Sequence, residues 1–164
     1  MIVRLFCVAV LALLISACAV TQVNLKHGMV QGDLSKPYAK VYFIRPFTEH
    51  PMGFSDNDLA VDVDGKRLMS LTKGEYTLVY LKPRDITITM TIPAQVRGRW
   101  EVTDMSQSRR FNLEPGQTYY INARLLDGEF RGARFIPTAM SRHEAQQAVR
   151  HLRAVGDAVS VPVS

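Results

Sequence analysis

The stretch that decides the fold is DITITMTI, residues 85–92. Apolar side chains occupy every second position, and threonines occupy the three positions between them. Because successive side chains of a β-strand point to opposite faces, a period of two indicates a half-buried antiparallel strand. The apolar face of such a strand must be covered by another layer, so the sequence predicts a mainly β domain.

Further segments with strand character lie on both sides of this stretch. They are five to nine residues long, several are rich in β-branched or aromatic residues, and Gly, Pro, Asp or Asn lie near their ends. They cover residues 39–45, 59–63, 66–71, 76–81, 109–113, 118–126 and 131–137. Short strands at this spacing predict an antiparallel β-sandwich or a small open barrel.

Turn signals connect these segments. Asp64-Gly65 is expected to supply the two positive-φ positions of a tight hairpin, which would place Asp62 opposite Arg67. Lys73-Gly74 marks another turn, and Asp127-Gly128 turns the chain towards the last strand. Residues 114–117, Glu-Pro-Gly-Gln, are expected to close a second hairpin between 109–113 and 118–126. Residues 93–108 form a longer polar connection.

One helix is expected at the C-terminal end. Ser141 and Glu144 form a capping-box pattern, and Ala145, Ala148, Val149 and Leu152 recur at helical spacing. Gly156 is the expected stop, and residues 157–164 are interpreted as a tail. The predicted sandwich domain therefore covers residues 38–156.

The N-terminus has a different character. Residues 1–17 contain one basic residue, Arg4, followed by an apolar run that is too short to span a bilayer and has the shape of a secretory signal. The ending Ile15-Ser16-Ala17-Cys18 resembles the lipobox of bacterial lipoproteins. The resemblance implies that Cys18 becomes the lipidated mature N-terminus, acylated with palmitate-type chains. Ala19 rather than Asp after the cysteine implies sorting to the outer membrane.

This processing changes how the composition is interpreted. Removal of residues 1–17 leaves 147 residues and lowers the formal net charge from +5 to +4. Residues 18–37 then form the lipidated cysteine and a polar tether. No cysteine remains for a disulfide, so the core alone must stabilise the domain. The scattered basic residues form no stripe of the kind that binds nucleic acid.

The order of motifs resembles a family of small bacterial lipoproteins built on a domain of unknown function. The matching motifs, all within residues 39–152, are Tyr42-Phe43-Ile44-Arg45-Pro46, Val63-Asp64-Gly65-Lys66, Gly74-Glu75-Tyr76 and Leu113-Glu114-Pro115-Gly116 followed by Tyr119-Tyr120. Residues 63–90 also resemble the PEGA-type repeat of bacterial surface proteins, although Pro83 is followed by Arg84-Asp85-Ile86 rather than by a glycine turn. Neither resemblance implies a catalytic residue.

Two groups of residues are candidates for chemistry. Glu49, His50, Asp56 and Asp58 could ligate a metal, but a solvated loop is the favoured interpretation because their spacing matches no known ligand loop. Arg97, Arg99 and Trp100 could grip a sugar ring or an aromatic partner. The alternative is a tryptophan buried at the core edge, and the strand tyrosines are interpreted as core and rim.

No nucleophile–base motif occurs in the sequence, and no cofactor is expected. The leading hypothesis is therefore a non-enzymatic outer-membrane lipoprotein, facing the periplasm, that acts as an interaction or adaptor module for another envelope protein. The alternative is a peptidoglycan-binding module that uses Arg97, Arg99 and Trp100. A hydrolase is the third hypothesis and has the least support.

Overall fold

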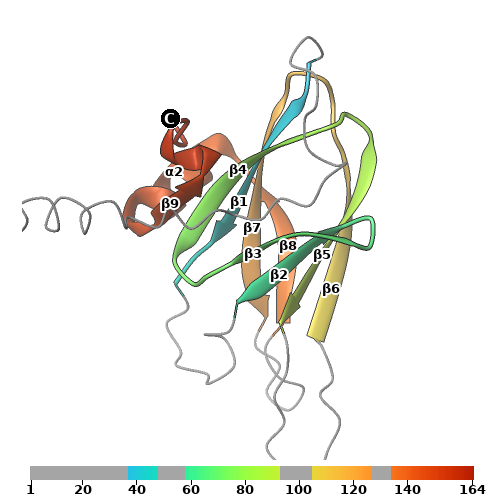
Figure 1. Ribbon diagram of the computed structural model, residues 1–164. Coiled ribbons are helices and arrows are strands. Elements are labelled where there is room, and N and C mark those ends of the chain that lie inside the picture. The colour runs from blue at the N-terminus through green and yellow to red at the C-terminus, as the bar shows by residue number, and fades with distance from the viewer. Residues whose placement is uncertain (1–36, 48–57, 93–104, 127–133) are drawn as a thin grey trace, which may run out of the picture.

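The computed structural model describes residues 37–47, 58–92, 105–126 and 134–164. These residues form two facing sheets, with a short helical segment beside the larger one (Figure 1). The sheet orders are β8-β7-β1-β4-β9 and β3-β2-β5-β6. The strands are β1 (Ala39–Arg45), β2 (Leu59–Val63), β3 (Lys66–Leu71), β4 (Glu75–Leu81), β5 (Asp85–Ile92), β6 (Met105–Asn112), β7 (Thr118–Leu126), β8 (Arg134–Met140) and β9 (Arg153–Gly156). The predicted β-sandwich is confirmed, and neither sheet closes into a barrel.

Strand β5 has the predicted two-faced character. Its apolar side chains are buried, and its threonines are half-exposed. It lies between β2 and β6 and pairs antiparallel with both. Because β5 is hydrogen-bonded on both edges, it is a central strand of the smaller sheet. Its alternation of apolar residues and threonines sets which face of that sheet meets the core.

The first predicted hairpin is also confirmed. Strands β2 and β3 pair antiparallel around Asp64 (φ 50°) and Gly65 (φ 74°), the positive-φ pair that a tight turn requires. Asp62 lies opposite Arg67, and Arg67 Nε donates to Asp62 Oδ1 at 2.5 Å.

The second predicted hairpin is wrong. Strand β6 pairs with β5, whereas β7 pairs with β1 and β8, so residues 114–117 carry the chain from one sheet to the other. Strand β6 also begins at Met105, within the expected polar connection, because Ser106 and Ser108 fit the solvent face opposite the β5 threonines. A Pro-Gly turn reverses the chain, but burial of apolar faces decides which strand becomes the neighbour.

The larger sheet is mixed rather than antiparallel. Strand β7 runs parallel to β1, and β9 runs parallel to β4. Both parallel strands are reached by connections that leave the sheet and return to it, which is the requirement for parallel pairing.

The C-terminal region differs most from expectation. Helix α2 (Arg142–Ala148) begins with the predicted capping box, in which Ser141 N donates to Glu144 Oε2 at 2.6 Å. The helix ends eight residues before Gly156 and is followed by the 3-10 turn η1 (Val149–His151), β9 and the 3-10 turn η2 (Asp157–Val159). The predicted tail is wrong, because Ala158 is fully buried and Val163 packs on the domain. The folded domain thus extends beyond residue 156.

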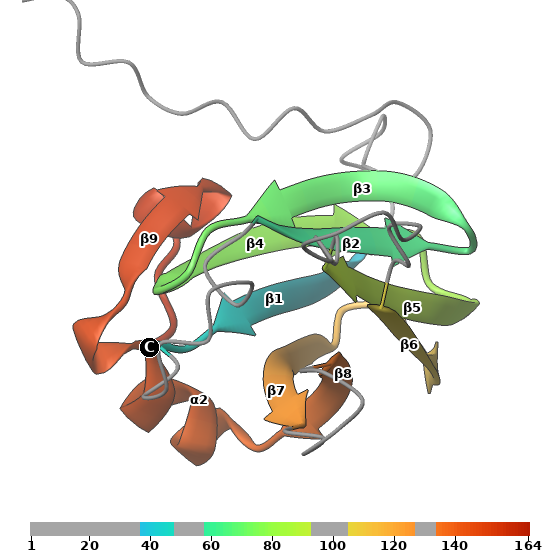
Figure 2. The same ribbon diagram turned by 90° about the horizontal axis from the view of Figure 1, so that it is seen from below.

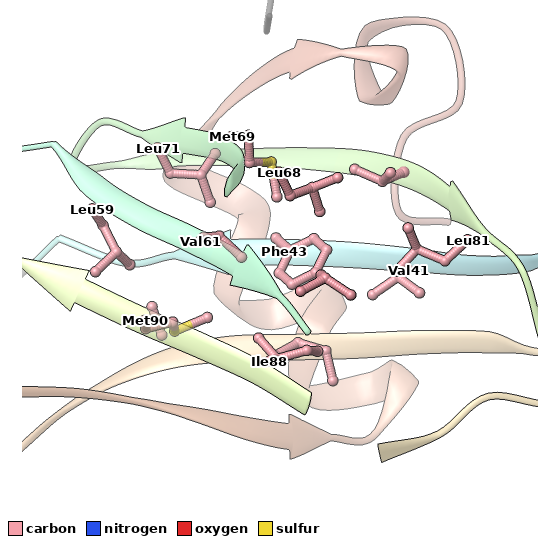
Figure 3. Packing of buried hydrophobic residues seen from close by; sticks show 14 of the residues in the cluster. Val41, Phe43, Leu59, Val61, Leu68, Met69, Leu71, Leu81, Ile88 and Met90 are labelled. Atoms are coloured by element: carbon pink, nitrogen blue, oxygen red, sulfur yellow. The ribbon is translucent and has the colours of Figure 1, made fainter. Parts of the chain in front are cut away.

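Two apolar clusters explain this arrangement. The main core lies between the sheets, and Figure 3 shows Phe43 of β1 surrounded by side chains such as Val61 and Ile88 from the facing sheet. The second cluster covers the outer face of the larger sheet, where Tyr42, Ile44, Tyr76 and Leu78 meet α2 and the C-terminal segment. In Figure 2, α2 lies on the opposite side of β1 from β2 and β3. The domain therefore has three layers, and the third is built from residues 141–152 and 157–164, on either side of β9 in the sequence.

Candidate functional site

Most of the residues selected from the sequence lie outside the described residues. These are the lipidation residue Cys18, the loop residues Glu49, His50 and Asp56, and the Arg97, Arg99 and Trp100 group. Their predicted roles remain predictions.

Asp58 is the one metal candidate that the structure places. It is exposed at the start of β2, and its Oδ1 accepts a hydrogen bond from Thr72 Oγ1 at 3.0 Å. Within ranges 37–47, 58–92, 105–126 and 134–164, no three His, Cys, Asp or Glu side chains gather as a metal site. Asp58 therefore acts here as a partner of the loop between β3 and β4. Across the same ranges, no helix has the length and apolar character needed to cross a membrane.

The structure shows a groove that the sequence did not predict. It has a volume of about 410 Å³ and lies on the outer face of the larger sheet, where β1 and β7 begin. Strands β1 and β7, the turn before β7, helix α2 and the C-terminal segment all contribute to it. The lining residues are Lys40, Tyr42, Gly116, Gln117, Thr118, Tyr120, Arg142, Val161, Pro162 and Ser164.

Two tyrosines form the floor of this groove. The parallel register places Tyr42 of β1 beside Tyr120 of β7, and their rings stack at 5.4 Å between centroids with 13° between planes. Tyr42 is 4% exposed, whereas Tyr120 is only partly buried. Burial, and then the neighbouring Tyr120, Tyr80 and Tyr76, raises the pKa of the Tyr42 phenol. Tyr42 therefore stays a neutral hydrogen-bond donor at physiological pH.

The C-terminal segment forms one wall of the groove. Tyr42 OH donates to the Val161 carbonyl at 2.9 Å, and Arg142 Nε donates to a main-chain oxygen of Ser164 at 2.6 Å. These two bonds join the last residues to β1 and α2, which lie far from them in the sequence. The wall therefore exists only because the third layer has folded onto the sheet.

Backbone hydrogen bonds fix the rim at the start of β1. Lys40 N donates to the Gln117 carbonyl at 2.9 Å, and Gly116 N donates to the Tyr38 carbonyl at 3.1 Å. The turn between the two sheets is thus held against the first residues of the domain. This positions Gln117 and Thr118 beside Lys40.

The groove lining holds two basic side chains and no Asp or Glu side chain. These are Lys40 and Arg142, and both are exposed. In the part of the chain that the structure describes, neither makes a salt bridge to an Asp or Glu side chain, whereas Arg67, Arg84 and Arg153 each do. Arg142 Nε is bonded to a main-chain oxygen of Ser164, which leaves the other guanidinium N–H groups as donors. The other lining side chains contribute hydroxyl and amide groups. This set of donors is complementary to an anionic group.

A second polar group lies at the opposite end of β1 and has a structural role. Arg45 is fully buried, donates to the Leu71 carbonyl, and lies with its guanidinium carbon 5.5 Å from the centre of the Phe135 ring. Next to it in the sheet, Glu75 accepts from Thr72 N at 2.9 Å and pairs with Arg153. These contacts link β1, β4 and β9 to the end of β3.

Sequence reasoning missed both groups for identifiable reasons. A charged residue ending the apolar run 39–45 is the signal that could have indicated the buried Arg45. Lys40 and Tyr42 lie two positions apart and therefore share one face of their strand, and the same holds for Thr118 and Tyr120. No feature of the sequence near either pair shows that the two pairs become neighbours. The strand tyrosines were expected as core and rim, and Tyr76 is buried whereas Tyr120 lines the groove.

No protein-family model matches the chain, and no curated protein or solved structure gives a significant match. The resemblance to small envelope lipoproteins therefore remains a prediction from motifs.

Proposed function

We propose that this chain is an outer-membrane lipoprotein of the bacterial envelope, anchored through Cys18, whose β-sandwich is a non-enzymatic interaction module. The groove at the start of β1 and β7 is its binding surface. The observation that carries the proposal is that Lys40 and Arg142 line the same groove, whose lining contains no Asp or Glu side chain. The lipobox-like sequence before Cys18 supports the location.

The chemistry of the groove favours binding over reaction. General acid–base or nucleophilic catalysis needs a nucleophile next to a tuned base. The groove lining holds no histidine, no cysteine and no Asp or Glu side chain that could act as such a base. Two cations beside amide and hydroxyl donors instead recognise and orient an anion, and the C-terminal wall limits its approach to one side.

Metabolic labelling tests the anchor. The full chain is expressed in a Gram-negative host with radiolabelled palmitate, beside a Cys18→Ala variant. We expect label and outer-membrane fractionation for the unaltered chain and loss of both in the variant. Label that persists in Cys18→Ala would contradict the lipoprotein assignment.

Affinity capture from detergent-solubilised envelopes tests the binding surface. The intact lipoprotein is compared with Lys40→Ala/Arg142→Ala and with the control Lys66→Ala/Arg110→Ala. The control removes the same charge from exposed positions on the smaller sheet. We expect the unaltered chain and the control to enrich the same envelope component, and the groove variant to lose it. Equal enrichment by all three, or none by any, would contradict the proposal.

The peptidoglycan alternative has a separate test. It places the contact at Arg97, Arg99 and Trp100 rather than at the groove. Co-sedimentation of the lipoprotein with purified sacculi, lost in Trp100→Ala and retained in the Lys40→Ala/Arg142→Ala variant, would favour this alternative over the groove.

A further inference from the structure

The groove lies at the end of the domain where the predicted tether enters it. Strand β1 begins at Ala39, and Lys40, which lines the groove, is its second residue. Tyr38, immediately before the strand, accepts the hydrogen bond that fixes the groove rim. Because the chain between Cys18 and β1 reaches the domain at this point, the groove is on the end that a lipid anchor would hold closest to the bilayer.

The tether is short enough to keep this end near the membrane. The 19 residues 19–37 could span at most roughly 65 Å, which is the fully extended limit for that number of residues. Tethering at this distance gives headgroups an effective concentration in the millimolar range or above at the groove. Two basic side chains alone give a low affinity for a free anion. At such a local concentration, headgroups can still occupy the groove to a substantial extent.

A further basic side chain lies at this end of the domain. Lys82 is exposed directly after Leu81, which pairs with Ala39 at the start of β1. Of two nearby carboxylates, Asp64 is paired with Arg84 at 2.7 Å, whereas Asp85 accepts from the uncharged Asn112 amide at 2.7 Å and keeps its negative charge.

Glu114 is a second acidic side chain at this end, on the exposed turn between the sheets. It lines neither the floor nor the wall of the groove. The acidic side chains of this end therefore lie outside the groove, and the basic side chains Lys40 and Arg142 lie inside it.

From these observations, and resting on the function proposed above, we infer that the groove binds the phosphate of an anionic phospholipid headgroup in the anchoring membrane. Lys40 and Arg142 contact the phosphate oxygens, with the Thr118 hydroxyl and the Gln117 amide as further donors. A volume of about 410 Å³ is large enough for a glycerophosphate group. The headgroup would orient the domain with its third layer towards the bilayer.

Fluorescence quenching in vesicles tests this orientation. Cys7 lies in the predicted signal segment and Cys18 carries the lipid, so an introduced cysteine offers a unique thiol for a dye. Val159→Cys places the dye on a 64% exposed side chain two residues from the groove wall, and Ser106→Cys places it on the smaller sheet as a control. The lipidated protein is reconstituted into phosphatidylcholine vesicles with or without phosphatidylglycerol, each containing a headgroup spin label.

We expect phosphatidylglycerol to increase quenching at residue 159 and not at 106, and high salt to abolish the increase. Each basic residue near an anionic surface changes the bound population about fivefold, so Lys40→Ala/Arg142→Ala should reduce the membrane-facing population about 30-fold. Lys66→Ala/Arg110→Ala should reduce it much less. Quenching that is independent of phosphatidylglycerol, or equal in both double variants, would overturn the inference.

A soluble arm distinguishes the source of the phosphate. Inorganic phosphate is titrated into the detergent-solubilised lipoprotein and followed by NMR shifts of groove residues. Saturation by inorganic phosphate together with quenching that is independent of phosphatidylglycerol would assign the groove to a free anion and overturn the lipid assignment. The two proposals can also fail separately. If Lys40→Ala/Arg142→Ala loses the captured envelope component but quenching does not depend on phosphatidylglycerol, this inference fails and the proposed function stands.

Discussion

Removing the hydroxyl of Tyr42 should release the C-terminal wall of the groove without disturbing its floor. The Tyr42→Phe variant keeps the ring that stacks on Tyr120 at 5.4 Å. It loses the hydrogen bond from the phenol to the Val161 carbonyl, which is 2.9 Å long. The substitution therefore separates the contact that holds the wall from the packing that forms the sheet face.

The size of the effect follows from the surroundings of this bond. A neutral hydrogen bond contributes about 1 kcal/mol net, and more when the abandoned partner stays buried. Val161 is 38% exposed, so water can reach its carbonyl after the change. We therefore expect a loss of about 0.5–1 kcal/mol, concentrated in local opening of residues 157–164 rather than in global unfolding.

Amide hydrogen exchange measures this local opening. Ser160 N and Val161 N both donate to the Asp157 carbonyl, at 3.2 and 3.0 Å, and their exchange reports opening of η2 and the wall. A loss of about 1 kcal/mol corresponds to roughly fivefold faster exchange in Tyr42→Phe. The control is Tyr80→Phe, a tyrosine of the same sheet face that packs on the second cluster. In Tyr42→Phe, but not in Tyr80→Phe, capture of the envelope component should weaken together with the faster exchange.

Two results would refute the reasoning. If Ser160 and Val161 exchange at the same rate in Tyr42→Phe and in the unaltered chain, the hydrogen bond does not hold the wall. If Tyr80→Phe accelerates them equally, the effect comes from loss of a polar group on the sheet face in general.

Three further predictions concern the fold. Gly74→Ala should cost about 1–2 kcal/mol in urea unfolding because Gly74 has a φ of 80°. The cost should persist in a Phe47→Ala background, because the Phe47 ring that the added Cβ would meet belongs to an exposed side chain that can move away. Ser141→Ala should destabilise the domain by about 1 kcal/mol. The backbone N–H of Ser141, and then its hydroxyl, lower the pKa of the Glu144 carboxyl. This cap therefore stabilises the fold above the unfolded-state pKa, and the contribution is lost as pH falls through the folded-state value. Ser141→Ala removes the hydroxyl part, so its stability curve from neutral to acidic pH should be flatter. Burial raises the pKa of Tyr76 above 10.0, so stability should fall as pH rises through the folded-state value, and Tyr76→Phe should lose less stability in unfolding measurements at alkaline pH.

Several features of the fold could be predicted because their causes are local. The alternation in 85–92 identified β5 and its buried face. The Asp64-Gly65 pair identified a tight hairpin, and Ser141 with Glu144 identified the start of α2. In each case the interacting residues lie within a few positions of one another, so propensity and side-chain reach are sufficient to specify the conformation.

The candidate groove could not be predicted in the same way. Lys40 and Arg142 are separated by about a hundred residues of chain and become neighbours only when β7 pairs parallel with β1 and the C-terminal segment folds across them. The residues that sequence reasoning selected instead, including His50 and Trp100, were chosen from local composition. Composition does not specify which surfaces a sheet brings together.

The sequence by itself determined the mainly β class, most strand positions, the tight hairpin and the helix cap, because these depend on backbone preferences and on the period of side-chain burial. It also predicts the lipid anchor at Cys18. Only the tertiary structure decided that β6 and β7 belong to different sheets and that Arg153–Gly156 adds a strand beside β4. It also decided that residues 157–164 form a groove wall instead of a tail. The physical reason is that strand neighbours and covering layers are selected by burying apolar faces against distant parts of the chain, and this selection leaves no signal at short range.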